Sequence, residues 1–116
     1  MAYEEILHAL ADDTRRKIFE DLRAGPKNVK ALSETKGVSR PAVSQHLKVL
    51  QRAGLVEVHQ RGTSRYYAVR RDGITPLRDY LDQFWEDVLN AFANEIADQQ
   101  EMGNDHTSGE DDQSGL

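Results

Sequence analysis

Five polar side chains that can bond to DNA recur between residues 40 and 52, and apolar residues with helical spacing separate them. The polar residues are Arg40, Ser44, Gln45, Lys48 and Arg52, and the apolar ones are Val43, Leu47 and Leu50. Apolar positions at i, i+4 and i+7 form one buried face of an α-helix. The polar side chains then point outward, where they can reach base edges and phosphates. This segment therefore predicts a helix that contacts DNA.

The ends of this helix are marked by residues that start and stop helices. Ser39 offers a side-chain oxygen to the first free backbone amides, and Pro41 falls in the first turn, where its missing N–H costs nothing. Gly54 follows the last periodic residues and can adopt the left-handed conformation that ends a helix. We expect the helix to lie between Ser39 and Gly54.

A second, shorter helix is predicted just before it. Val29, Ala31 and Leu32 supply its apolar positions, and residues 37–39 supply a tight turn. Two helices joined in this way form a helix-turn-helix.

Two short β-prone runs follow the second of these helices, at residues 55–58 and 66–69. The residues between them, 59–65, include Gly62 and two arginines. A hairpin with a basic tip beside a helix-turn-helix is a wing, which is a second element that can touch the DNA backbone or the minor groove. The sequence therefore predicts a winged helix.

Two more helices are predicted at the N-terminus, where they supply packing. Their apolar residues are Ile6, Leu7 and Leu10 in the first helix, and Ile18, Phe19 and Leu22 in the second. Asp12 or Asp13 caps the second helix, and the Gly25-Pro26 pair ends it. We expect Arg15 to be exposed, and we favour a structural role for it over a phosphate contact.

The chain is again predicted to be helical from Pro76 to about Gln100. The apolar residues of this helix are Leu77, Tyr80, Leu81, Phe84, Trp85, Val88, Leu89, Phe92 and Ile96. Such a stripe is too wide for a helix that packs only on its own small domain, because Phe84 and Trp85 lie on adjacent faces. One face can pack on the core and the other on a second copy of the chain, so we expect a homodimer.

The charge is divided unevenly along the chain. Residues 24–71 hold ten Lys or Arg against two acids, a net of +8, whereas residues 74–116 hold one Arg against eleven acids, a net of −10. The overall charge of −5 therefore does not argue against a polyanionic partner. We expect the basic part to face DNA while the acidic part is solvated or points away.

The length of 116 residues predicts one domain, which we place at residues 1–102. Residues 103–116 are rich in Gly, Ser, Asp and Glu, so we expect a disordered acidic tail there. No apolar run approaches about 18 residues, and the N-terminus is unlike a signal peptide. We therefore expect a soluble, cytoplasmic protein that makes no contact with a membrane.

Three stretches of the chain resemble the ArsR-like family of winged-helix transcriptional repressors. They are ALADDTRRKIFEDL at residues 9–22, VSQHLKVLQRAGLVEV at 43–58 and RGTSRYYAV at 61–69, and together they cover most of residues 3–71. The resemblance implies a mostly α fold with a small β-hairpin wing, which dimerises through its terminal helices. It also implies a repressor that binds a palindromic operator in double-stranded DNA.

Two sets of residues are assigned to these tasks. The DNA-binding set is Ser39, Arg40, Pro41, Ser44, Gln45, His46, Lys48, Arg61, Ser64 and Arg65. The dimerisation set is Ile6, Leu81, Phe84, Trp85, Val88, Leu89 and Phe92.

The chain departs from the metal-sensing ArsR-like proteins in its ligand residues. It has no cysteine, so residues 30–34, which match the thiolate segment of soft-metal sensors, contain none. Residues 77–100 contain no histidine, which a zinc site across the dimer helices would need. We expect no metal site and no cofactor, and the inducer, if there is one, would be a small molecule or a protein.

Two other classes of function compete with transcriptional regulation. Catalysis has little support, because the chain has no cysteine, no Gly-rich phosphate loop and no recognisable Ser, His and acid motif. We expect that the protein is not an enzyme. A winged helix can also be a protein-interaction module without DNA contact, but such a module does not need Arg40, Lys48, Arg61 and Arg65 on its outward faces.

Overall fold

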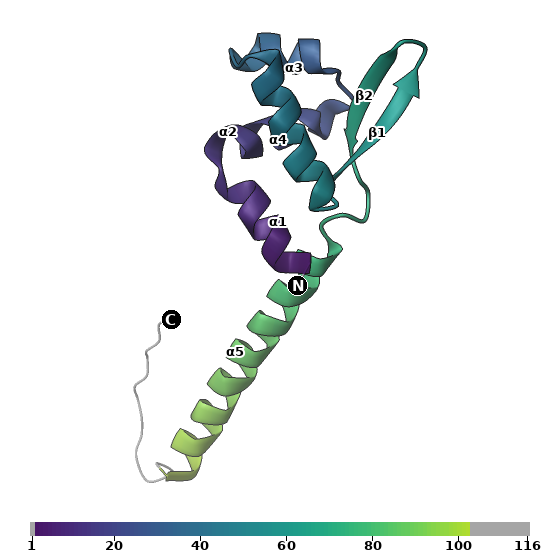
Figure 1. Cartoon of the computed structure of the whole chain (residues 1–116). Helices are drawn as coiled ribbons and strands as arrows, with labels where there is room; N and C mark the ends of the chain where they lie inside the picture. Colours follow the sequence, from purple (N-terminus) through teal and green to yellow (C-terminus); the bar gives the residue numbers. More distant parts are fainter. Residues whose placement is uncertain (1, 103–116) are drawn as a thin grey trace. The chain divides into compact units, whose positions relative to one another are not determined.

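The computed structural model describes residues 2–102, and the acidic tail expected at residues 103–116 lies outside them. The elements are α1 (Ala2–Ala11), α2 (Asp13–Asp21), the 3₁₀ helix η1 (Leu22–Ala24), α3 (Val29–Lys36), α4 (Arg40–Arg52), β1 (Val56–Arg61), β2 (Ser64–Val69) and α5 (Thr75–Met102) (Figure 1). The strands β1 and β2 form one antiparallel hairpin. The predicted fold class, mostly α with a small hairpin wing, is confirmed.

Internal contacts divide the chain into two units. The first, Met1–Tyr80, contains α1 to α4, the hairpin and the start of α5. The second begins at Leu81, and its described part is the rest of α5. The domain predicted at residues 1–102 therefore spans both units. No helix among residues 2–102 is long and apolar enough to span a membrane.

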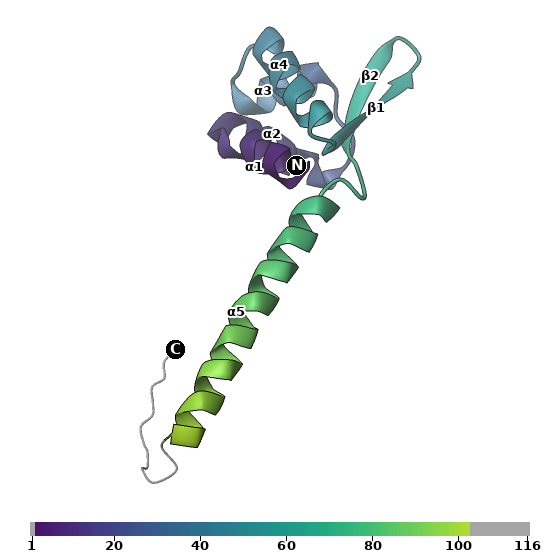
Figure 2. The same ribbon diagram turned by 60° about the horizontal axis from the view of Figure 1, so that its bottom comes forward.

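The core of the first unit lies between its helices and the base of the hairpin. Its largest buried side chains are Ile6, Ile18, Leu22, Leu32, Val43, Leu47, Leu50 and Leu55. Fully burying an aliphatic side chain of this size contributes about 1.5–3 kcal/mol. In Figure 2, α1 and α2 lie together on one side of the pair formed by α3 and α4. The predicted apolar stripe of α4 is confirmed, because Val43, Leu47 and Leu50 are each 0% exposed.

Ile6 belongs to this core, and its assignment to the dimer interface was wrong. Its side chain is 0% exposed within a single chain, so none of its surface is left for a partner. Leu7, the next residue of α1, is 46% exposed instead. The helical spacing of Ile6, Leu7 and Leu10 fits either environment, and only the packing of α1 on α2 and α4 decides which face is buried.

The helix-turn-helix predicted at α3 and α4 is present, and its turn is shaped by Gly37. Gly37 ends α3 in the left-handed region with φ 64°, and its amide donates to the carbonyl of Ser33. The Ser33 hydroxyl donates to the carbonyl of Val38, which holds the turn on the end of α3. After α4, Gly54 has φ 80°, the left-handed conformation expected of a residue that stops a helix.

The hairpin is longer than the sequence predicted. Strands expected at residues 55–58 and 66–69 extend to Val56–Arg61 and Ser64–Val69, which leaves only Gly62 and Thr63 as the turn. Gly62 has φ 62° at the first position of this two-residue turn, where a compact hairpin favours glycine. The outer half of the hairpin is mostly exposed and polar, so it lacks the apolar alternation by which strands are recognised.

The wing is fastened to the rest of the unit by a third stretch of backbone. The amide of Lys27 donates to the carbonyl of Tyr67 at 3.0 Å, and the amide of Tyr67 donates to the carbonyl of Lys27 at 2.8 Å. Residue 27 comes just before α3, so this bridge joins the start of the helix-turn-helix to β2. The wing and α4 are therefore positioned by one continuous scaffold.

Candidate nucleic-acid interface

The first turn of α4 is fixed by its cap. Ser39 has an extended backbone, with φ −64° and ψ 153°, and its hydroxyl oxygen accepts a hydrogen bond from the amide of Ala42 at 3.3 Å. Pro41 lies in the first turn, as predicted. A Ser cap of this kind typically contributes about 1 kcal/mol to the helix. The N-terminal half of α4 is thus held rigidly, which is what a helix that contacts base edges requires.

The outward face of α4 carries cations that the protein itself does not use. Arg40, Gln45 and Lys48 are exposed, and Ser44 is half-buried beside them. Within residues 2–102, neither Arg40 nor Lys48 has a hydrogen bond or an ion pair with the protein. Their charges are therefore available to phosphates at no cost in broken contacts.

Other basic residues of this unit differ, because they are paired. Arg16 and Lys17 bond to Asp13 at 2.6 and 3.1 Å, and Lys27 and Lys36 lie 3.6 and 4.0 Å from Asp21. These pairs hold α2 and its junction with α3. The contrast divides the cations of the unit into structural ones and available ones.

The wing arginines predicted for DNA contact lie on opposite faces of the hairpin. Gln60 is opposite Arg65 and Arg61 is opposite Ser64, and side chains alternate along each strand. Arg65 therefore shares its face with buried Tyr67, whereas Arg61 shares the other face with Tyr66. The Arg61 guanidinium carbon lies 4.9 Å from the centre of the Tyr66 ring, a cation–π contact that steadies the wing. Arg65 has no such partner among residues 2–102.

His46 lies away from the other residues of the DNA-binding set. It is half-buried, and its Nδ1 atom is 3.5 Å from Nη1 of Arg15 on α2. The sequence placed it beside Ser44 and Gln45 as a direct DNA contact. The structure instead places it where α4 meets the junction of α1 and α2.

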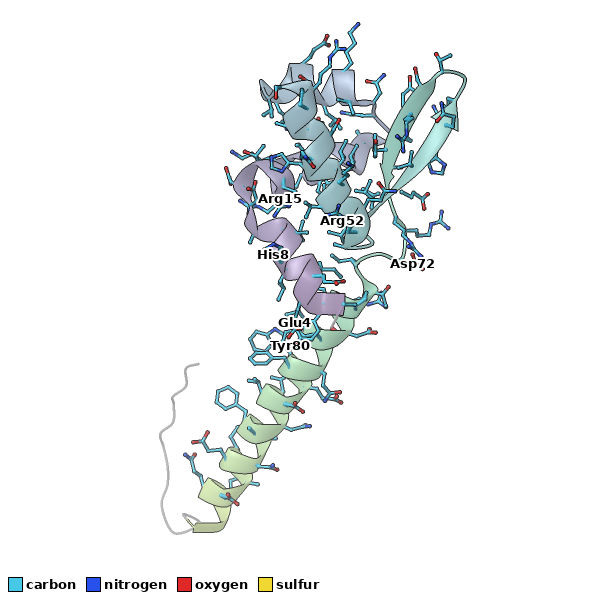
Figure 3. The ribbon with its side chains drawn as sticks, viewed as in Figure 1. Glu4, His8, Arg15, Arg52, Asp72 and Tyr80 are labelled. Atoms are coloured by element: carbon cyan, nitrogen blue, oxygen red, sulfur yellow. The ribbon has the colours of Figure 1, made fainter. Side chains whose placement is uncertain are left out.

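Arg15 has the structural role that the sequence favoured. Its Nε donates to the carbonyl of Ala9 at 2.6 Å and its Nη2 to the carbonyl of His8 at 3.2 Å (Figure 3). These carbonyls lie in the last turn of α1, where no intrahelical donor is available. The Arg15 side chain therefore closes the end of α1 and reaches α4 as well. Sequence spacing carries no signal for this contact, because it depends on how α1 folds back on α2.

The cap of α2 lies at the same junction. The Asp12 carboxylate accepts a hydrogen bond from the amide of Arg15 at 2.9 Å, as one of the two alternatives for this cap predicted. That bond, helped by the charge of Arg15, holds the pKa of Asp12 below its ordinary value.

The apolar stripe of α5 is exposed in the single chain beyond Tyr80. Trp85 and Leu89 are 56% and 59% exposed, and Phe84 and Trp85 make an edge-to-face contact with ring centres 5.8 Å apart. Leu81, Phe92 and Ile96 are exposed as well, while Val88 is half-buried. The first turns of α5 are different, since Leu77 packs on the core and Tyr80 stacks on Tyr3 of α1 at 4.1 Å.

No group of three or more His, Cys, Asp or Glu side chains within residues 2–102 is arranged to hold a metal ion. His59 bonds to Glu57 at 2.8 Å on the exposed wing, a pair of two residues only.

Comparison with known proteins places this geometry in a family. A family model described as a helix-turn-helix domain matches residues 10–59, which run from α1 into β1. A solved structure named as an ArsR family transcriptional regulator is 28% identical, with a TM-score of 0.68, and covers 74% of this chain and 94% of its own. The HTH-type transcriptional regulator Rv2034 of Mycobacterium tuberculosis is 50% identical over 88 residues, which is 76% of this chain and 82% of that protein.

The chain belongs to the ArsR-like family of helix-turn-helix transcriptional regulators. Another relative, named the transcriptional repressor SdpR of Bacillus subtilis, is 29% identical over 82 residues, which is 67% of this chain and 91% of that protein. A solved structure from Mycobacterium bovis, 26% identical with a TM-score of 0.61, covers 78% of this chain and 83% of its own. It is described as a homodimeric winged helix-turn-helix DNA-binding domain.

Membership of the ArsR-like family gives α3 and α4 their names. The two helices are the helix-turn-helix, α4 is its recognition helix, and the hairpin β1–β2 is the wing. This protein is a DNA-binding transcriptional regulator.

Proposed function

We propose that this ArsR-like regulator is a homodimeric repressor that binds a palindromic operator through α4 and the wing. Its relatives support this proposal, since one is named a repressor and one is described as a homodimer. In this assignment Arg40, Ser44 and Gln45 approach base edges in the major groove. Lys48, Arg61 and Arg65 hold phosphates on either side.

The observation that carries the proposal is the set of available cations. Arg40 and Lys48 on α4 and Arg65 on the wing are exposed and have no partner within residues 2–102. They lie on a helix and a hairpin that share one scaffold through α4, β1 and the bridge at Lys27. A protein-interaction module would give these charges no task, whereas a duplex supplies phosphates for all three.

Dimerisation through α5 supplies the second half of the proposed function. Exposed apolar side chains that recur with helical spacing, such as Leu81, Trp85 and Leu89, mark an interaction surface. Two copies related by a two-fold axis present two recognition helices to two half-sites, so the operator has the same symmetry as the dimer. We assign Leu81, Phe84, Trp85, Val88, Leu89 and Phe92 to this surface, and we expect the dimer to act in the cytoplasm.

A salt titration tests the DNA contact directly. Binding of a fluorescently labelled, random-sequence duplex is measured by anisotropy as the salt concentration rises. The logarithm of the affinity should fall linearly with the logarithm of the salt concentration, by about 0.9 for each phosphate neutralised. Lys48→Ala should reduce this slope by about one such step.

Lys17→Ala is the matched control, since it removes the same charge from α2, where Lys17 is paired with Asp13. It should leave the slope unchanged. Equal slopes for wild type, Lys48→Ala and Lys17→Ala would contradict the assignment of α4 to DNA. A wild-type protein that fails to bind duplexes would favour the interaction module.

A further inference from the structure

Three contacts of one side chain connect the DNA-facing helix with the N-terminal helices. The Arg15 guanidinium donates to the carbonyls of His8 and Ala9 in α1, and its third nitrogen, Nη1, faces Nδ1 of His46 at 3.5 Å. Figure 3 shows Arg15 beside the end of α1. The two carbonyl contacts fix where the guanidinium lies, so His46 meets a donor with a defined position.

This arrangement determines which nitrogen of His46 carries the proton. A guanidinium has only donors and stays protonated in proteins, so Nη1 can bond to Nδ1 only if Nδ1 has a free lone pair. A neutral imidazole with a free Nδ1 carries its hydrogen on Nε2. The contact with Arg15 therefore favours the Nε2–H tautomer of His46.

Nε2 of His46 has no protein partner of its own. Among residues 2–102, Arg15 provides the one hydrogen-bond contact of the ring, and the Asp12 carboxylate nearby is held by the amide of Arg15. The ring is half-buried, at the border between buried Leu47 and exposed Gln45. An N–H group fixed at the border of the DNA-facing surface is suited to an acceptor that comes from outside the protein.

We propose that Arg15 is a positioning residue that sets the tautomer of His46, so that Nε2–H of His46 donates a hydrogen bond to a phosphate oxygen of bound DNA. The proposal rests on the proposed function, because it needs a duplex against α4. A phosphate is the acceptor that fits best, since a half-buried ring at the side of α4 does not protrude far enough to enter a groove. The positive charge of Arg15 behind the ring further favours an anionic acceptor.

Two substitutions at His46 separate this role from simple packing. His46→Asn keeps an acceptor near the position of Nδ1 and loses the outer donor, whereas His46→Gln keeps a donor near the position of Nε2. Affinity is measured on a random-sequence duplex, because a phosphate contact does not depend on base sequence. We expect His46→Asn to lose about tenfold or more in affinity and His46→Gln to lose clearly less.

The opposite order would overturn the proposal, since it would show that only the acceptor toward Arg15 matters. Equal affinities of the two variants would overturn it as well. Circular dichroism spectra and unfolding temperatures identify any variant that has lost its fold. A wild-type protein that does not bind the duplex would instead remove the proposed function itself.

The tautomer can be measured without DNA. Two-bond ¹H–¹⁵N correlation spectra of the free protein, recorded at alkaline pH where the ring is neutral, distinguish a protonated Nε2 from a protonated Nδ1. Wild type should show the proton on Nε2, Arg15→Met should show both tautomers, and Arg15→Lys should restore much of the wild-type pattern. A proton on Nδ1 in wild type would overturn the proposal whatever the DNA measurements give.

Discussion

Gly73 lies directly against the carbonyl oxygen of Gly54. A Cβ atom built on Gly73 would stand 2.2 Å from this oxygen and 3.1 Å from the Cα of Leu55. The contact joins the loop after the wing to the end of α4, and both neighbours are backbone atoms that cannot rotate away. Glycine is therefore the residue that allows the wing to return to the recognition helix.

Gly73→Ala should consequently destabilise the first unit. The added methyl group forces a backbone shift, and overpacking of this kind costs about 1–3 kcal/mol. The free energy of unfolding, measured by chemical denaturation, should fall by that amount. Gly62→Ala is the comparison, because Gly62 has a positive φ but nothing within 4 Å of the added Cβ. A Gly73→Ala protein as stable as wild type would show that the two loops do not touch in solution.

Asp12 gives a pH-dependent test of the α2 cap. The bond from the Arg15 amide lowers the pKa of Asp12 from its ordinary value of 3.8. A carboxyl with a lowered pKa in the folded state stabilises the fold above its unfolded pKa, and this contribution is lost as the pH falls through the folded pKa.

Thermal unfolding of wild type and Asp12→Asn, compared from about pH 7 down to about pH 2, should follow this sign. Wild type should be the more stable protein above about pH 4, and the difference should shrink as the pH falls. Asn keeps a capping oxygen but cannot ionise, so the pair isolates the charge. A difference that is the same at every pH would mean that Asp12 acts only through its geometry.

The recognition helix is the part of the site that local sequence determines most completely. Ser39 caps α4, Pro41 lies in its first turn, and Gly54 takes a left-handed conformation just after it, all as predicted. Each of these effects acts within one turn of the chain. Patterns of this range can be recognised in a sequence because the residue and its effect are neighbours.

The features that sequence analysis missed depend on approaches between distant segments. The length of the wing depends on a two-residue turn at Gly62, and the bridge from Lys27 to Tyr67 joins backbones 40 residues apart. Ile6 has the residue type expected of an interface and lies in the core instead. His46 and Arg15 meet across α2 and α4 although no motif links them. Tertiary packing, which a helical pattern does not encode, decides each of these cases.

Base recognition and phosphate binding should fail in different ways. Gln45→Ala should reduce the discrimination between the operator and altered sites by about 1–3 kcal/mol, because an amide can make two hydrogen bonds to one base. Arg65→Ala should weaken binding to all duplexes alike and lower the salt slope by about one. Affinities for an operator and for single-base variants of it measure both effects. If Arg65→Ala changed base preference and Gln45→Ala did not, the two roles would be reversed.

The dimer should depend on the apolar face of α5. Trp85→Ala combined with Leu89→Ala removes large side chains that are more than half exposed in the single chain. Truncating such residues in a packed interface typically costs about 2–5 kcal/mol each, so the double variant should sediment as a monomer and lose operator affinity. Asn94→Ala is the control, because Asn94 lies nine residues after Trp85 on the opposite face of the helix. A double variant that remains a dimer would place the interface elsewhere.

Selection of DNA fragments from a random library by the purified protein is the most direct test of the account. Two recognition helices related by a two-fold axis should enrich an inverted repeat, with half-sites about 10 base pairs apart, centre to centre, or a multiple of this spacing. The enriched sequence should bind more tightly than random duplex at the same salt concentration, typically by about 10³-fold or more. Fragments that show no enrichment over the starting library, or a single site without symmetry, would contradict a homodimeric regulator that binds its operator through α4.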